Sequence, residues 1–203
     1  MQLEGDTIRK MESKDLECVV QTHLESFPGF FLSFLGVRFL RLFYAGVVDA
    51  PEGISFVYLD SDGQPSGFVA GTTNPRGFYR RLLVRDWLKF SFASIGAILR
   101  KPSTIVRVAR GISHPASNPI GSDVAGLFSI GVRPNLQGVG AGKKLVQKFI
   151  DEARSMNCKR VFLTTDQENN EIVNDFYLKL GFSVGRQYET PEGRKMNEYW
   201  ITL

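Results

Sequence analysis

The chain has little cysteine and no long apolar run, and both absences narrow its class. Its two cysteines, Cys18 and Cys158, lie far apart in 203 residues, so neither a disulfide framework nor a zinc site is predicted. We expect both to be buried or incidental thiols. No uninterrupted apolar run reaches the length of a membrane span, and the start, MQLEGDTIRK, has no apolar segment typical of a signal peptide. The default expectation is a cytoplasmic enzyme.

The composition is that of an ordinary globular protein. Hydrophobic residues make up 43% of the chain and charged residues 23%, which excludes disorder as its main character. A length of 203 residues allows one domain with a substantial core and is too short for two full ones. We therefore predict a single domain over residues 1–203.

Basic residues are concentrated in one segment. Residues 75–111 hold nine Lys and Arg side chains against a single acidic residue, Asp86. The net charge of +4 thus divides into about +8 in this segment and −4 in the remainder. Because this composition differs from that of its surroundings, we predict a helical, basic insertion at about residues 75–121.

Within this segment the spacing of charges predicts one basic amphipathic helix. Basic side chains recur at i, i+4 and i+8, at Arg81, Arg85 and Lys89. The other side of the same helix carries aromatic and aliphatic side chains, namely Tyr79, Leu83, Trp87 and Phe90. A further short helix is expected at 103–109. The basic face is a solvated surface, a cap that attracts an anionic acceptor, or a face resting on an anionic membrane. Nucleic acid is not expected as a partner, because the aromatic residues follow helical burial.

Periodicity and turn residues place the other elements. Strands are predicted at residues 7–11, 54–59, 66–73, 127–132, 160–165, 182–188 and 198–203. Helices are predicted at about 16–24, capped by Ser13 or Asp15, at 31–47, and at 170–180. Aromatic residues crowd the junction of the first two helices, where they either pack a core or border a substrate pocket; they are Phe27, Phe30, Phe31 and Phe34.

The most informative stretch is Leu127 to Ala153, which reads as strand, glycine-rich turn and helix. Such a turn presents unpaired backbone N–H groups and the positive end of a helix dipole, which suits a phosphate or pyrophosphate. A Walker A loop does not fit, since Gln137 stands at its first glycine and Lys144 replaces its hydroxyl residue. A dinucleotide fingerprint does not fit either, because Gly138, Gly140 and Gly142 fall at the first, third and fifth positions.

A third pattern does fit, Gln/Arg-x-x-Gly-x-Gly/Ala, through Gln137, Gly140 and Gly142. At this point the chain resembles the GNAT acyltransferase superfamily, which binds the pyrophosphate of acetyl coenzyme A (acetyl-CoA) on this loop. A second motif supports the resemblance: Asn, six residues, Tyr, three residues, Gly-Phe. It matches Asn170, Tyr177, Gly181 and Phe182. The resemblance is good from about Ala125 to the end and loose from Thr7 to Thr73.

The resemblance implies an α/β (α+β) fold with a mixed sheet of about seven strands, whose two parallel central strands splay apart. Acetyl-CoA would be the co-substrate, and no metal is expected. The pantetheine arm would lie along the backbone of the strand at 127–132, and the pyrophosphate would sit on the turn. The implied cofactor-binding residues are Ser129, Ile130, Gly131, Val132, Gln137, Gly138, Val139, Gly140, Ala141, Gly142, Lys143, Asn170 and Tyr177. Lys143 or Lys144 could add positive charge toward a phosphate.

The resemblance also implies how acyl transfer would proceed. A backbone N–H near Ile130 would stabilise the oxyanion, and Tyr177 would donate a hydrogen bond or a proton to the leaving sulfur. A phenol of pKa near ~10 protonates a thiolate of pKa about 8.5 only uphill, so stabilisation is the main expectation. The general base stays open: Glu25 and Asp166 are the candidates carried forward. His23, Asp123 or a chain of water molecules could also act as the general base. For Asp166 the simpler role is to cap the helix that follows it.

The sequence therefore predicts an N-acetyltransferase acting on the primary amine of a small, in some cases anionic, acceptor such as an amino sugar, a nucleotide sugar or an antibiotic-like amine. Acetylation of a protein N-terminus or lysine is an alternative within the same class. A different class is an acyl-CoA-binding sensor without turnover. The acceptor, the acyl-chain preference and the choice between monomer and homodimer do not follow from the sequence.

Overall fold

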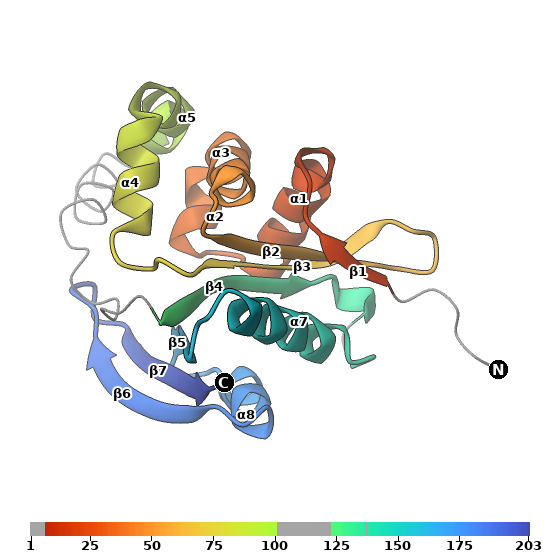
Figure 1. The fold of residues 1–203 in the computed structure, drawn as a ribbon. Coiled ribbons are helices and arrows are strands. Elements are labelled where there is room, and N and C mark those ends of the chain that lie inside the picture. The colour runs from red at the N-terminus through yellow and green to blue at the C-terminus, as the bar shows by residue number, and fades with distance from the viewer. Residues whose placement is uncertain (1–6, 101–122, 137) are drawn as a thin grey trace.

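A computed structural model describes residues 7–100, 123–136 and 138–203. A seven-stranded mixed sheet runs in the order β1-β2-β3-β4-β5-β7-β6. Helices α1, α2 and α3 cover one face of the sheet and α7 and α8 the other, while α4 and α5 extend the first layer (Figure 1). The predicted fold class is confirmed.

The strands are β1 (Thr7–Lys10), β2 (Gly53–Leu59), β3 (Pro65–Thr72), β4 (Val124–Val132), β5 (Arg160–Asp166), β6 (Ser183–Glu189) and β7 (Lys195–Thr202). The helices are α1 (Leu16–Ser26), α2 (Phe31–Leu35), α3 (Val37–Asp49), α4 (Phe78–Arg85), α5 (Trp87–Arg100), α7 (Ala141–Ser155) and α8 (Glu171–Lys179). Neighbouring strands are antiparallel except β4 and β5, which are parallel.

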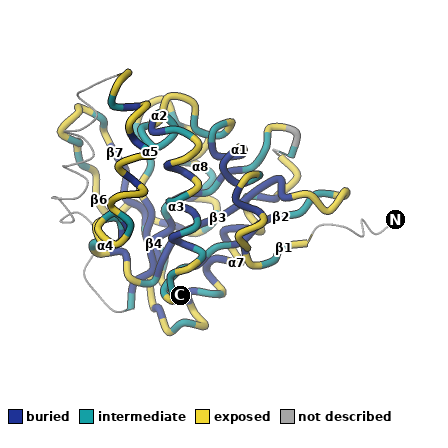
Figure 2. Tube along the Cα trace, turned by 90° about the horizontal axis from the view of Figure 1, so that it is seen from above, coloured by how far each residue is buried: buried dark blue, intermediate teal, exposed yellow. Residues whose placement is uncertain are grey.

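The sheet has an apolar core on each face. On one side α7 packs Leu145, Val146 and Phe149 against side chains of β2 to β5. On the other side α1 to α5 enclose Phe68 and Ala70 of β3. All residues of β3 are buried as a result, and Figure 2 shows the central strands as the most buried part of the trace.

Asp15 precedes α1 but does not cap it with its side chain. Its buried carboxylate accepts hydrogen bonds from the Arg9 guanidinium at 2.6 and 2.7 Å and from the Glu12 N–H at 2.8 Å. Asp15 does stand at the N-cap position of α1, but the predicted side-chain cap was wrong, because no side-chain hydrogen bond is made to the helix. The carboxylate instead joins the end of β1 to the turn before α1.

The helix predicted at 31–47 is two helices, because the chain breaks at Gly36. Gly36 has φ +92°, a left-handed conformation that any L-residue would adopt only with strain. It ends α2 and begins α3.

The predicted basic helix of the insertion is also two helices. It breaks at Asp86, whose carboxylate accepts hydrogen bonds from Arg85 Nε at 2.9 Å and Lys89 Nζ at 2.8 Å. The break rotates Trp87 outward, so that 61% of it is exposed, and its expected place on the buried side was wrong. The rest of the insertion, including the helix predicted at 103–109, lies outside the described residues.

Cys158 is buried and Cys18 is half-buried, and both are free thiols. Within the described part of the chain, no helix is both long and apolar enough to cross a bilayer.

Candidate cofactor and acceptor site

The parallel strands β4 and β5 pair over a short stretch and then separate. Residues 124–126 of β4 lie opposite residues 160–162 of β5. Beyond them β4 stays paired with β3, and β5 with β7. Among the described residues, 129–132 therefore have no strand partner on the side of β4 that faces β5. We call this opening between the C-terminal ends of β4 and β5 the mouth.

An irregularity in β4 lies at the start of the mouth. Ala70 of β3 is opposite Ser129, whereas the next residue, Gly71, is opposite Leu127, so Phe128 is an extra residue in β4. Such a bulge bends its strand and increases the local twist. The ring of Phe128 packs against aromatic rings of α4. This bend contributes to the divergence of β4 from β5.

The glycine-rich turn and the first residues of α7, residues 138–143, form what we call the glycine cradle. Gly138 and Gly140 have φ of +84° and +86°, and apart from their chain neighbours no heavy atom of the described residues lies within 4 Å of where their side chains would begin. The Lys144 N–H donates to the Gly140 carbonyl, so the preceding helical N–H groups have no acceptor within α7. An anion fits there. Gln137 lies outside the described residues, and its role stays a prediction.

The glycine cradle adjoins the mouth. A side chain at Gly142 would come within 3.5 Å of the Phe176 ring and 4.0 Å of Val132. The start of α7 therefore lies between α8 and the end of β4. Lys144 Nζ lies 6.0 Å from the centre of the Tyr58 ring. Lys143 is exposed at the cradle and remains the predicted source of positive charge.

Two asparagines fix α8 to the ends of β5 and β7. Asn170 Nδ2 donates to Thr165 Oγ1 and to the Asp166 carbonyl, both at 2.9 Å. Asn174 Nδ2 donates to the same carbonyl at 3.2 Å, and its oxygen accepts from the Tyr199 hydroxyl at 3.0 Å. Asn170 thus positions the helix, and contact between Asn170 and a cofactor stays a prediction.

Tyr177 is held by rings and not by hydrogen bonds. Only 4% of it is exposed, and its ring centre lies 5.2, 5.7 and 5.9 Å from those of Phe176, Phe182 and Tyr199. Its hydroxyl makes no hydrogen bond with another described residue. Burial raises the pKa of Tyr177 above the ordinary phenol value, so the hydroxyl keeps its proton. The hydroxyl is therefore available as a hydrogen-bond donor.

The connection between α1 and α2 reaches the β5 side of the mouth. Phe27 and Phe30 meet edge to face at 5.5 Å, and the Arg194 guanidinium lies 5.1 Å from the centre of the Phe30 ring. Arg194 also donates to both oxygens of Asp166, at 2.7 to 3.0 Å. Capping of α8 by the Asp166 side chain was therefore a wrong expectation. Arg194 itself lies in a turn, where nothing in the sequence singled it out.

Glu25 lies on the β4 side of the mouth. Its Oε2 is 4.0 Å from Nε of Arg133, which directly follows β4, and its Oε1 accepts from Gln21 at 2.9 Å. Asp123 lies at the opposite end of β4, 3.7 Å from Arg160. The structure thus brings Glu25 and Asp166 to the mouth from opposite sides and keeps Asp123 away from it.

Three buried polar atoms beside the mouth have no hydrogen-bond partner among the described residues: His23 Nε2, Ser26 Oγ and Arg133 Nε. Ser26 faces β4, since a side chain at Gly131 would begin 2.9 Å from its Oγ. Buried polar groups in native proteins are nearly always satisfied by protein or by ordered water. This cluster therefore fits a water molecule or a polar substrate group.

His23 is joined to β4 through Tyr44 of α3. Its Nδ1 lies 2.6 Å from the Tyr44 hydroxyl, which also bonds with the side chain of Ser129. Burial lowers the pKa of His23 to about 4, so the imidazole is neutral at neutral pH. Tyr44 was missed from the sequence, because its place beside Phe43 in an apolar helix is typical of a core residue.

This arrangement of strands, cradle and tyrosine agrees with a known family. The model of the acetyltransferase (GNAT) family matches residues 19–182. The chain belongs to the GNAT family. Members of the GNAT family are acyltransferases with acetyl-CoA as co-substrate, so the chain is an acyltransferase. A comparison with curated proteins finds no match.

Solved structures of GNAT enzymes share the fold at low identity. Ard1 from Thermoplasma volcanium is 18% identical, with a TM-score of 0.63 and 98% of each chain covered. The ribosomal-protein-S18-alanine N-acetyltransferase from Escherichia coli is 17% identical, with a TM-score of 0.56, and 97% of this chain and 93% of that chain are covered. The spermidine/spermine N-acetyltransferase SpeG from Vibrio cholerae is 16% identical, with a TM-score of 0.57 and coverage of 98% and 92%.

Metal ligands are not gathered in this GNAT chain as far as the structure describes it: no group of three or more His, Cys, Asp and Glu side chains is placed to hold an ion.

Proposed function

We propose that the chain transfers the acetyl group of acetyl-CoA to the primary amine of a small acceptor, by direct attack of the amine on the thioester. One observation carries the proposal: Tyr177 lies on α8 beside the glycine cradle, only 4% of the residue is exposed, and its hydroxyl makes no hydrogen bond with another described residue. A hydroxyl without a hydrogen bond adds little to the stability of the fold and is free to bond with a bound molecule.

The residues present fit acetyl-CoA, which supplies an activated thioester and a pyrophosphate. The open space around Gly138 and Gly140 admits phosphate oxygens close to the backbone, and the first N–H groups of α7, which have no acceptor within the helix, would donate to them. Residues 129–132 offer the backbone groups on the free side of β4 to the pantetheine arm, as a neighbouring strand would.

Two groups of the chain stabilise charge during the transfer. A backbone N–H near Ile130 donates to the thioester oxygen, where negative charge develops as the amine adds. Tyr177 donates a hydrogen bond to the departing sulfur. Because burial raises the pKa of Tyr177 well above that of a thiol, full proton transfer is uphill, and the hydrogen bond is the main contribution.

The amine must lose a proton, and two carboxylates lie at the mouth that could accept it. They differ in how strongly each is already bound by an arginine. Both oxygens of Asp166 accept hydrogen bonds from Arg194, so this ion pair would have to open first. Glu25 lies on the surface, 4.0 Å from Arg133, and is not held by a bidentate ion pair. We therefore place Glu25 first and Asp166 second as general base, acting directly or through one water.

The surroundings of the mouth favour a small acceptor with an anionic group. The Phe27–Phe30 connection extends to the β5 side, where the Arg194 guanidinium lies over the Phe30 ring. Arg133 Nε and Ser26 Oγ are buried donors without a described partner. A carboxylate or phosphate of the acceptor would satisfy both, which agrees with an amino sugar or a nucleotide-linked amine.

The test is release of coenzyme A thiol from acetyl-CoA in the presence of paired acceptors. Each pair has the same amine with and without an anionic group, such as glucosamine and glucosamine 6-phosphate, and peptides with a free N-terminus or lysine complete the panel. We expect turnover with small amines, a higher kcat/KM for the anionic member, and a loss of turnover in Tyr177→Phe.

Two outcomes contradict the proposal. Faster turnover of the peptides than of every small amine would make the chain a protein acetyltransferase. Binding of acetyl-CoA in calorimetry, with no thiol release for any amine, would make it a sensor of acyl-CoA.

A further inference from the structure

The α5 helix has a continuous apolar stripe on its outer side. Leu88, Phe92, Ile95 and Leu99 follow one another at spacings of four, three and four residues, which places them in one line along a helix. Between 46% and 78% of each residue is exposed, and Trp87 lies exposed at the start of the same helix. Soluble proteins expose single apolar residues everywhere, but a row of this length indicates an interaction surface.

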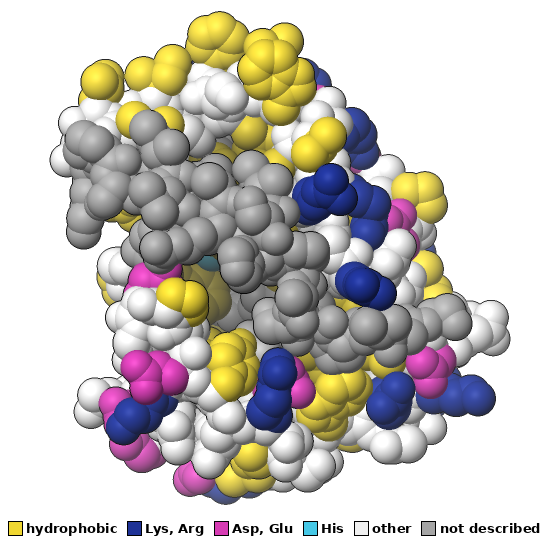
Figure 3. All heavy atoms as spheres, turned by 90° about the vertical axis from the view of Figure 1, so that its left-hand side faces the viewer, with side chains coloured by type: hydrophobic (Ala, Val, Ile, Leu, Met, Phe, Trp, Pro, Cys, Tyr) yellow, Lys and Arg dark blue, Asp and Glu magenta, His cyan; other side chains and the backbone are white. Residues whose placement is uncertain are grey.

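The opposite side of α5 anchors it to the body of the protein. Phe90, Ser94 and Ala97 are buried, and the Phe90 ring meets Phe39 of α3 edge to face at 4.9 Å. The exposed stripe is therefore held in a fixed orientation. Figure 3 shows hydrophobic side chains gathered at the top of the molecule, over the region of α4 and α5, with Lys and Arg side chains nearby.

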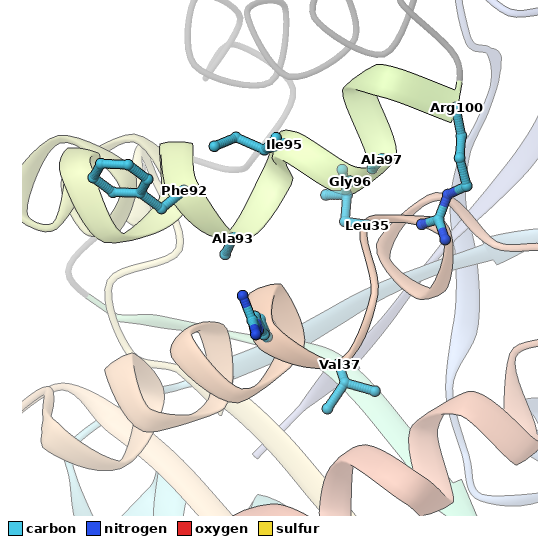
Figure 4. A pocket seen from close by; sticks show the side chains of 9 residues that line it. Leu35, Val37, Phe92, Ala93, Ile95, Gly96, Ala97 and Arg100 are labelled. Carbon is cyan, nitrogen blue, oxygen red and sulfur yellow. The ribbon is translucent and has the colours of Figure 1, made fainter.

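A groove beside the stripe adds positive charge to this surface. It has a volume of about 450 Å³ and lies between α5 and the α2–α3 pair (Figure 4). Arg38 and Arg100 are its charged lining residues, and Leu35, Val37, Phe92 and Ile95 line it with apolar groups. Arg100 lies 5.5 Å from the centre of the Phe34 ring. A phosphate-bearing headgroup with its apolar neighbour fits such a lining.

The charges of α4 and α5 are almost all of one sign. Asp86, which lies between the two helices, is the single acidic residue of 78–100, and it is already paired with Arg85 and Lys89. A second copy of the chain would bring two positively charged faces together, which opposes a symmetric dimer through this face. Nucleic acid fits poorly, because the aliphatic members of the stripe cannot stack on bases. An apolar row with an aromatic residue at one end and basic residues beside it suits an anionic bilayer.

We propose that the α5 face docks the protein on an anionic lipid bilayer. Leu88, Phe92, Ile95 and Leu99 enter the boundary between headgroups and acyl chains, and Arg38 and Arg100 contact lipid phosphates. This docking is independent of the acetyltransfer proposed above, since none of its residues belongs to the mouth or to the glycine cradle.

The experiment is co-sedimentation of the full chain with phosphatidylcholine vesicles, with and without phosphatidylglycerol. We expect binding to the anionic vesicles, loss of most of it when the ionic strength rises well above about 0.15 M, and little binding to the neutral ones. The double variant Phe92→Glu/Leu99→Glu should bind anionic vesicles at least tenfold more weakly. These side chains are exposed, so circular dichroism and thermal unfolding should match wild type.

Ile172→Glu/Val184→Glu is the matched control, because it introduces the same two negative charges at residues of α8 and β6 that are 87% and 45% exposed. It should bind vesicles as wild type does. Equal binding to neutral and anionic vesicles, no binding at low salt, or wild-type binding by the double variant would each overturn the proposal. So would a dimer in sedimentation equilibrium that the double variant dissociates, since the face would then belong to a second copy.

Discussion

The imidazole of His23 and the phenol of Tyr44 form a buried pair, with 2.6 Å between Nδ1 and the hydroxyl oxygen. The other imidazole nitrogen is buried without a partner among the described residues. Burial lowers the pKa of His23 from 6.5 to about 4. At pH 5, His23 is therefore mostly protonated in the unfolded chain and mostly neutral in the folded one. The free energy of unfolding must then depend on pH through this residue.

We expect His23→Asn to remove part of the acid sensitivity of the fold. The stability that neutral His23 provides is complete above pH 6.5 and is lost as the pH falls toward 4. The shift corresponds to about 3 kcal/mol across that window. Asparagine keeps a polar atom near Tyr44 and does not titrate. Urea denaturation at several pH values measures the difference, and parallel curves for the two proteins would contradict it.

Tyr177→Phe should lower kcat by at least tenfold and leave the KM for acetyl-CoA nearly unchanged, because the hydroxyl acts on the departing sulfur. The ring contacts remain, and no described residue loses a hydrogen bond, so the melting temperature should not fall. Since burial raises the pKa of Tyr177, wild-type kcat should show no loss from ionisation of this phenol at mildly alkaline pH. Steady-state kinetics across pH checks both points, and a wild-type kcat in the variant would remove Tyr177 from the mechanism.

Val139→Glu should raise the KM for acetyl-CoA roughly tenfold, because it places a carboxylate in the glycine cradle beside the pyrophosphate. Val139→Gln is the control of equal shape, and it should stay near wild type. Val139 is 55% exposed, so neither change should disturb the fold. Replacing Gly140 would be a poorer test, since any side chain at φ +86° strains the turn itself. Equal KM values for the Glu and Gln variants would argue against a phosphate site here.

Glu25→Gln should reduce kcat at neutral pH by at least tenfold and flatten the acidic limb of its pH profile, as expected for loss of a general base. Asp166→Asn should have the smaller effect on that limb, because Arg194 engages both oxygens of Asp166. The two pH profiles are measured with saturating acetyl-CoA. The reverse order of effects would assign the base to Asp166, and two unchanged profiles would leave proton removal to water.

The strands around the mouth and the glycine cradle could be predicted because their signals are local. Short runs rich in apolar residues mark β4 and β5, and the cradle and the Asn170–Tyr177 motif each fit within a short window. Pairs made by distant parts of the chain could not be predicted. Asp166 meets Arg194 across 28 residues, and His23 meets Tyr44 across 21. Two predicted helices were broken, at Gly36 and at Asp86. Gly36 adopts φ +92°, which glycine tolerates and a continuous helix does not allow, so this break had a local signal that the prediction overlooked.

The β4–β5 pair has the fewest paired residues of all neighbouring strands in the sheet. Three residue pairs join the two halves there. A ligand laid along residues 129–132 would act as the missing length of strand and tie one half to the other. Amide hydrogens on that edge should then exchange quickly in the ligand-free protein and slowly with the co-substrate bound, so the molecule completes its own sheet when it takes up its substrate.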